Sequence, residues 1–111
     1  MPPFPSLRRK ADFDALSRSG TTGSSPLLVL RAMRTGRPET RVGMSTPRSL
    51  GGAVQRNRMR RRLRAVVREQ LASIGAGWDL LLIARPAAAA ASHGELRDTL
   101  QTLVRRAGIG E

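Results

Sequence analysis

The sequence contains no cysteine and no tyrosine, and only three of its 111 residues are aromatic. Without cysteine the chain has no disulfide, no thiolate zinc site and no cysteine nucleophile. Its single histidine, His93, has no second imidazole or thiolate with which to form a metal site. We therefore interpret His93 as a helix-start residue rather than a catalytic base. The lack of cysteine is compatible with an intracellular protein, and we expect a cytoplasmic location.

Acidic residues are few and scattered, since eight of them accompany 20 basic residues and the formal net charge is +12. A two-metal nuclease needs clustered carboxylates, and the chain shows no such cluster. The pair Gly51-Gly52 is not followed by the Gly-Lys-Ser/Thr ending of a phosphate-binding loop. We therefore expect no catalytic residue, no metal site and no cofactor in the protein itself. In any reaction that involves it, another molecule would carry the chemistry.

Long hydrophobic runs are also missing, so no segment is long and apolar enough to predict a membrane span. The first residues, Met1 to Pro5, lack the apolar core of a signal peptide. We expect no membrane partner and a single domain over residues 1–111. The early prolines favour an extended tail over residues 1–6.

Arginine is abundant and concentrated in one segment, where seven arginines and no acid lie between positions 56 and 68. At about 100° per residue, its apolar side chains fall within one third of a helical wheel and a polar row lies opposite. The apolar side comprises Met59, Leu63, Val66, Val67 and Gln70, and the polar row comprises Asn57, Arg61, Arg64 and Arg68.

This pattern favours a nucleic-acid surface over a merely solvated face. Solvated faces usually mix both signs of charge, because like charges at i,i+4 repel each other. Arginine binds phosphates bidentately and keeps its charge, and a polyanion would neutralise the repulsion within the row.

The rest of the chain predicts short alternating helices and strands. Ser92 and Glu95 form a capping-box pattern, so the last helix is expected to begin near Ser92, after an alanine connector at 87–91. We interpret residues 21–25 as a loop. The strand at 41–45 is expected to run antiparallel to that at 27–30, and 79–84 is expected to be central because it is apolar on both faces. The expected elements are helices over 11–16, from 53 onward and from 92 to 108, with strands over 27–30, 41–45 and 79–84.

Two neighbouring segments resemble the signature of the bacterial ribonuclease P protein subunit. They read Arg41-Val42-Gly43-Met44-Ser45 and Gly51-x-Ala53-Val54-x-Arg56-Asn57-Arg58-x-Arg60-Arg61-x-Leu63-Arg64. Three further segments are similar to the family's first helix, last strand and final helix, and the resemblance thus covers nearly the whole chain. They are Leu7-Arg8 with Asp12-Phe13, Leu81 to Pro86, and Glu95 to Val104.

The resemblance implies a protein that partners a catalytic RNA, which uses bound Mg²⁺ to cut the 5′ leader from precursor tRNA. It implies no obligate protein partner. The implied fold is a small α+β sandwich in the order α-β-β-β-α-β-α, shared with the second domain of a small-subunit ribosomal protein. Its arginine helix would make a left-handed β-α-β crossover, against the usual right-handed rule. The implied RNA-subunit contacts are Arg56, Asn57, Arg58, Arg60, Arg61, Arg64 and Arg68, and the implied leader cleft contains Phe13, Val29, Arg31 and Arg48.

Several positions depart from the family pattern. Ser17 stands where relatives usually carry a second aromatic residue, and Arg31 stands where they often carry tyrosine. With so few aromatic residues, we expect little base stacking in the cleft and more reliance on its arginines and backbone groups. Further departures are Pro47, Ser49 and Gly52.

Other functional classes remain open from composition alone. A ribosomal or other structural RNA-binding protein would also be small, basic and free of cysteine. An architectural DNA-binding protein could use the same arginine face, although no dimer-forming feature is visible. An autonomous nuclease is disfavoured by the missing carboxylate cluster.

Overall fold

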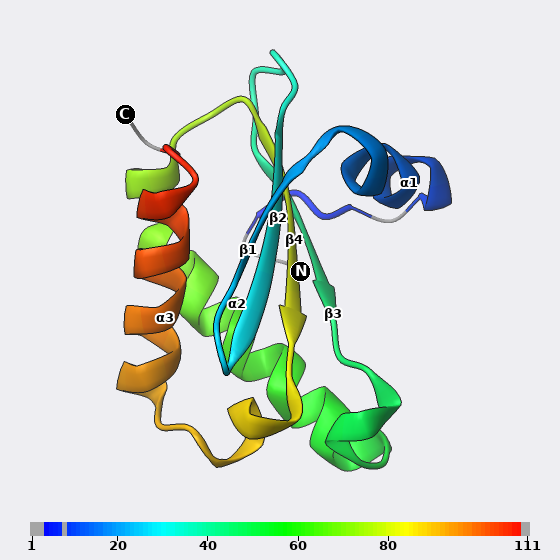
Figure 1. Cartoon of the computed structure of the whole chain (residues 1–111), viewed down its shortest axis with the longest axis vertical. Coiled ribbons are helices and arrows are strands. Elements are labelled where there is room, and N and C mark those ends of the chain that lie inside the picture. The colour runs from blue at the N-terminus through cyan, green and yellow to red at the C-terminus, as the bar shows by residue number, and fades with distance from the viewer. Residues whose placement is uncertain (1–3, 8, 110–111) are drawn as a thin grey trace.

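The structure is a computed structural model that describes residues 4–7 and 9–109. Its main elements occur in the predicted order α-β-β-β-α-β-α (Figure 1). Two short 3-10 helices, η1 (Arg48–Leu50) and η2 (Pro86–Ala90), precede the second and third helices. The main elements are α1 (Lys10–Ser19), β1 (Thr21–Ser24), β2 (Leu28–Arg34), β3 (Arg41–Ser45), α2 (Ala53–Ile74), β4 (Trp78–Ala84) and α3 (His93–Arg106).

The four strands form one sheet in the order β1-β2-β4-β3. β4 lies between β2 and β3, which confirms the prediction of a central strand. β3 runs antiparallel to β2 as expected, but the two strands are not neighbours because β4 separates them. The loop predicted at 21–25 is wrong, since Thr21–Ser24 pair with β2 as an antiparallel edge strand.

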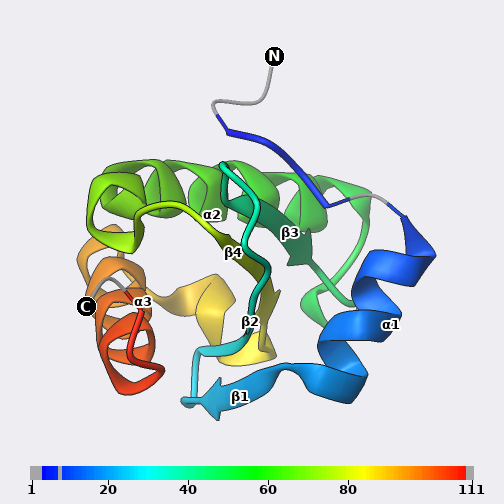
Figure 2. The same cartoon turned by 90° about the horizontal axis from the view of Figure 1, so that it is seen from above.

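The sheet separates two layers of helix. Figure 2 shows α2 and α3 on one face and α1 on the other. The larger core lies under α2 and α3, whereas a smaller cluster of Leu7, Leu16 and Leu81 lies under α1. α2 connects the parallel neighbours β3 and β4. Figures 1 and 2 together show that this crossover is left-handed, as the resemblance implies.

The apolar side of α2 lies where its periodicity predicts. Met59, Leu63, Val66, Val67 and Gln70 are all buried against the sheet and α3. Gln70 belongs to this side because its Nε2 donates a hydrogen bond of 3.0 Å to the carbonyl oxygen of Arg97 on α3.

The start of α3 confirms the predicted capping box. The backbone N–H of Glu95 donates to Ser92 Oγ at 3.1 Å, and the N–H of Ser92 donates to Glu95 Oε1 at 2.9 Å. The bond from the Ser92 N–H is the main reason why the pKa of the Glu95 carboxyl lies below its usual range. The alanine connector forms η2, and Ala88 and Ala91 turn into the core.

The segment before α1 is extended and lies along β3. The N–H of Val42 donates to the carbonyl oxygen of Pro5 at 2.9 Å, and the N–H of Leu7 donates to the carbonyl oxygen of Val42 at 3.2 Å. Phe4 is buried in the larger core, so this stretch packs on the domain. Residues 1–3 of the predicted tail, and Arg8, lie outside the described residues. Across the described ranges, no helix has the length and apolar character needed to span a membrane.

Candidate nucleic-acid interface

The solvent side of α2 carries a shallow hollow bordered by basic and amide side chains. Arg60 Nη1 donates a hydrogen bond of 2.9 Å to Asn57 Oδ1, which holds these two side chains together. The hollow is lined by Val54, Asn57, Arg60, Arg61 and Arg64. Four of the seven residues predicted to contact an RNA subunit therefore border this hollow.

The other three predicted RNA contacts lie apart from this hollow. Arg56 is half-buried, and its Nε donates to the carbonyl oxygen of Thr46 at 2.7 Å, so it also fixes the connection between β3 and α2. Arg58 is exposed on the side of α2 that faces η2, and Arg68 is exposed one turn beyond Arg64.

Arg62 has a structural role that the sequence did not reveal. Its guanidinium donates to the carbonyl oxygens of Ala88 and Ala91 and thereby ties η2 to α2. These carbonyls belong to the connector before α3, so Arg62 fixes the position of that connector.

The positive charge of α2 is not neutralised within the described chain. Among the described residues, Arg41 and Arg97 form ion pairs with carboxylates and His93 contacts Glu69, whereas no arginine of α2 forms an ion pair. The arginines of α2 therefore repel each other in the free protein, and a row of phosphates would relieve that repulsion.

The opposite face of the sheet is covered only in part. Figure 1 shows α1 beside one end of the strands, which leaves the other end open. Strand register places four side chains in a row across this open end, with half-buried Val29 and Ile83 at its centre. The complete row is Ser24, Val29, Ile83 and Ser45.

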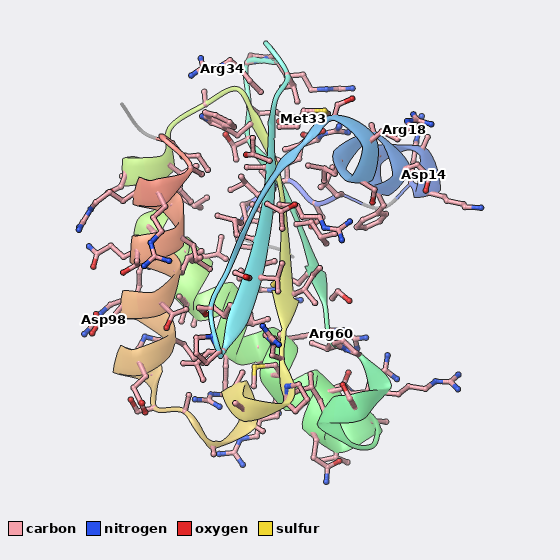
Figure 3. The ribbon with its side chains drawn as sticks, in the orientation of Figure 1. Asp14, Arg18, Met33, Arg34, Arg60 and Asp98 are labelled. Atoms are coloured by element: carbon pink, nitrogen blue, oxygen red, sulfur yellow. The ribbon has the colours of Figure 1, made fainter. Side chains whose placement is uncertain are left out.

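Phe13 lies at the covered end of this face. Its ring rests against Gly43 of β3, where an added Cβ would come within 3.0 Å of the Phe13 ring. Glycine at this position therefore makes room for the aromatic ring. Phe13 is half-buried beside the Leu16 cluster, and Figure 3 shows Met33 between the sheet and α1. The ring thus packs on the small core and still presents part of its surface.

Arg31 forms the boundary between the covered and the open parts. Its Nη1 donates a hydrogen bond of 2.8 Å to Ser17 Oγ on α1. Its Nε is buried and makes no hydrogen bond with the described residues. Arg48, the other predicted cleft arginine, is exposed on η1, which follows the open end of β3. Phe13, Val29 and Arg31 therefore share one sheet face, whereas Arg48 lies beyond the end of β3 on η1, which packs against α2 and η2.

A partly buried ionic network, missed in the sequence, holds α1 on this face. Arg41 on β3 donates to both carboxylate oxygens of Asp79 on β4, at 2.9 and 2.7 Å. It also contacts Asp12 on α1 at 3.2 Å. The hydrogen bond with Asp79 is the main reason why the pKa of Arg41 is raised. The only sign of this network in the sequence was Asp79, an acid at the start of the apolar strand 79–84.

The acidic and imidazole groups do not assemble into a metal site within the described residues. His93 is the first residue of α3, as expected, and its Nε2 lies 2.5 Å from Glu69 Oε1 on α2. Both side chains are exposed, so this pair links two helices at the surface.

An unneutralised arginine helix and a half-open sheet face define a small basic protein of the α+β class with a surface suited to nucleic acid. The sequence model of the family described as Ribonuclease P matches residues 1–108. The chain therefore belongs to the family of bacterial ribonuclease P protein components. Members are the RNA-binding subunit of ribonuclease P and act in the maturation of tRNA 5′ ends, in partnership with the RNase P RNA.

Sequence relatives agree with this assignment, and solved structures share the fold. The Ribonuclease P protein component of Roseiflexus sp. (strain RS-1) is 40% identical over 104 residues, which cover 93% of this chain and 85% of that protein. That of Acidothermus cellulolyticus is 43% identical over 102 residues, covering 90% and 85%. The Thermotoga maritima RNase P protein superposes with a TM-score of 0.82 at 25% identity, covering 91% of this chain and 96% of that one. The Staphylococcus aureus RNase P protein superposes with a TM-score of 0.85 at 22% identity, covering 96% and 97%.

Proposed function

We propose that this protein holds the RNase P RNA on α2 and the 5′ leader of precursor tRNA on the half-open face of the sheet. The RNA subunit would carry out the cleavage, and the protein would supply no catalytic residue. We further propose that this takes place in the cytoplasm, without an obligate protein partner.

The observation that carries this proposal is the separation of two RNA-compatible surfaces by the sheet and its core. The arginines of α2 lie on one side, and the row centred on Val29 and Ile83 lies on the other, next to α1. One polyanion cannot occupy both surfaces without passing around the domain. Two RNA segments, one on each surface, fit this arrangement.

The α2 surface would bind the RNA subunit through phosphates. Its arginines carry unpaired charge, and their fork geometry matches phosphate oxygens. The proposed contact residues are Arg56, Asn57, Arg58, Arg60, Arg61, Arg64 and Arg68.

The sheet face would bind a single strand rather than a duplex. Its floor is narrow and mixes aliphatic and hydroxyl side chains, with Phe13 at one end and Arg31 beside it. Single-stranded RNA can present both bases and phosphates to such a surface. The proposed leader contacts are Phe13, Val29, Arg31 and Arg48.

The Mg²⁺ ions of the complete enzyme would be held by RNA. In support, both acids beside the sheet face are already engaged, since Asp12 and Asp79 bind Arg41. Metal-assisted hydrolysis needs carboxylate or phosphate oxygens that are free to coordinate. The RNA offers such oxygens in abundance.

Cleavage assays with separated components test this proposal. Precursor tRNA is incubated with the protein alone, with the RNase P RNA alone, and with both, at low and high Mg²⁺. We expect no cleavage by the protein alone and faster cleavage by the complex than by the RNA at low Mg²⁺. Cleavage by the protein alone would refute the proposed division of labour.

A further inference from the structure

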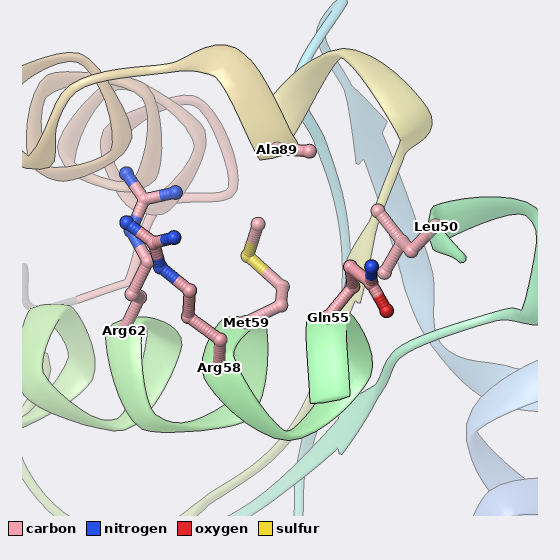
Figure 4. A pocket seen from close by; sticks show the side chains of 6 residues that line it. All are labelled: Leu50, Gln55, Arg58, Met59, Arg62 and Ala89. Atoms are coloured by element: carbon pink, nitrogen blue, oxygen red, sulfur yellow. The ribbon is translucent and has the colours of Figure 1, made fainter. Parts of the chain in front are cut away.

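A small pocket lies where the N-terminal half of α2 meets η1 and η2, apart from the hollow on the arginine face. Its volume is about 90 Å³. It does not include any of the residues that border the hollow or the sheet face. The pocket is lined by Leu50, Gln55, Arg58, Met59, Arg62 and Ala89 (Figure 4).

The walls of this pocket combine apolar and charged groups. Met59 and Leu50 are buried and form an apolar floor, and the Ala89 methyl group closes the opposite side. Figure 4 shows the two guanidinium groups on one side of Met59 and the Gln55 amide on the other. A thioether and aliphatic groups suit the surface of a planar ring.

The charged end of the pocket favours an anion. Arg58 and Arg62 lie four residues apart on one helix, so their like charges repel each other. Arg62 is held in place by the carbonyl oxygens of Ala88 and Ala91, which leave its positive charge intact. No acidic residue in the described ranges forms an ion pair with Arg58. A phosphate at this end would meet two guanidinium groups, one of them already fixed.

We propose that this pocket takes the base edge of one unpaired nucleotide of the RNase P RNA, with the phosphate of that nucleotide held by Arg58 and Arg62. This inference rests on the proposed binding of RNA by α2. A cavity that holds benzene measures about 150 Å³, so a pocket of this size accepts the edge of a ring and leaves the sugar outside. The Gln55 amide can both donate to and accept from a base edge. The nucleotide must be unpaired, because pairing hides that edge.

Filling the pocket without changing the charge tests the proposal. Ala89→Leu places a larger side chain in the pocket, and Ala90→Leu makes the same change at an exposed neighbour on η2 that does not line it. Binding of the RNase P RNA from the source organism is measured against salt concentration for both variants and the parent. Chemical probing of base edges in the bound RNA identifies nucleotides that the protein protects. Thermal unfolding monitors the fold of each variant.

We expect Ala89→Leu to weaken RNA binding by roughly tenfold, as the loss of one base contact does. The slope of affinity against salt should stay unchanged because no phosphate contact is removed. One protected nucleotide should become reactive with Ala89→Leu and stay protected with Ala90→Leu.

Equal affinity and equal protection for both variants would overturn the pocket assignment while leaving RNA binding by α2 intact. A parent protein that fails to bind the RNA at all would overturn the pocket and the proposed function together. Equal weakening by both variants would show a general disturbance of η2 and would also overturn the assignment.

Discussion

Arg31 on β2 donates a hydrogen bond of 2.8 Å to Ser17 on α1. These are the two positions at which the resemblance to the ribonuclease P protein family leads one to expect aromatic side chains. In this protein a hydrogen bond between polar side chains joins the two positions, so the Arg31 guanidinium lies at the edge of the cleft. Nη1 of Arg31 is used by Ser17 and its Nε is buried, so the other Nη atom is the donor that can meet a leader phosphate.

Removing the charge of Arg31 should therefore weaken binding of the leader. We expect Arg31→Met to lower the affinity of the complex for precursor tRNA several-fold. It should also flatten the salt dependence by about 0.7 units, the value for one phosphate contact on a single strand. Ser17→Ala keeps the charge and should leave this slope unchanged. Fluorescence titrations at several salt concentrations measure the affinity and the slope for each variant. An unaltered slope in Arg31→Met would argue against a phosphate contact.

The half-buried ring of Phe13 should contribute to recognition of the leader. Phe13→Leu keeps most of the apolar volume over Gly43, so the melting temperature should change little. Loss of ring stacking should reduce the preference for precursor over mature tRNA, because a stacked base contributes about 1–3 kcal/mol. Affinity for the RNA subunit should stay the same. If the variant and the parent prefer precursor equally, Phe13 serves only the small core.

The two sides of α2 should respond to mutation in opposite ways. Leu63 is fully buried, so Leu63→Ala should lower the free energy of unfolding by about 2–5 kcal/mol. Arg61 is exposed, so Arg61→Ala should leave the melting temperature nearly unchanged or raise it slightly, while weakening RNA binding. Urea unfolding and RNA titration of both variants measure these effects. A large loss of stability in Arg61→Ala with normal RNA binding would contradict the observed orientation of α2.

The Arg41–Asp79 pair should stabilise the fold. Asp79→Ala leaves a largely buried guanidinium with only Asp12 as its partner, so we expect a loss of about 3 kcal/mol in the free energy of unfolding. Asp14→Ala is the matched control, because Asp14 is exposed on the outer side of α1 (Figure 3). Similar unfolding curves for the two variants would show that the network is not important for stability.

The sequence predicted those elements whose pattern is local. The 3.6-residue period of α2 placed Met59, Leu63 and even Gln70 on the buried side, and Ser92 with Glu95 marked the start of α3. Both patterns act within a few residues along the chain.

Features that depend on distant partners could not be predicted in this way. Thr21–Ser24 contain no apolar residue, and they form a strand only because the edge of β2 is available for pairing. The insertion of β4 between β2 and β3 likewise depends on a crossover through α2. The sequence shows Asp12, Arg41 and Asp79 as isolated charges, and only the folded sheet brings them together. Arg62 resembles its neighbours in sequence, and only the fold brings its guanidinium to the carbonyl oxygens of Ala88 and Ala91.

The most direct test of the central claim is the salt dependence of RNase P RNA binding after removal of two charges from α2. Each phosphate contact on a duplex contributes about −0.9 to the slope of log K against log salt. We predict that Arg61→Ala combined with Arg64→Ala flattens the slope by about one to two units. Arg105→Ala combined with Arg106→Ala, which removes the same charge from the last turn of α3, should change it much less. An unchanged slope in the α2 variant, with its fold intact, would contradict the claim that this face binds the RNA.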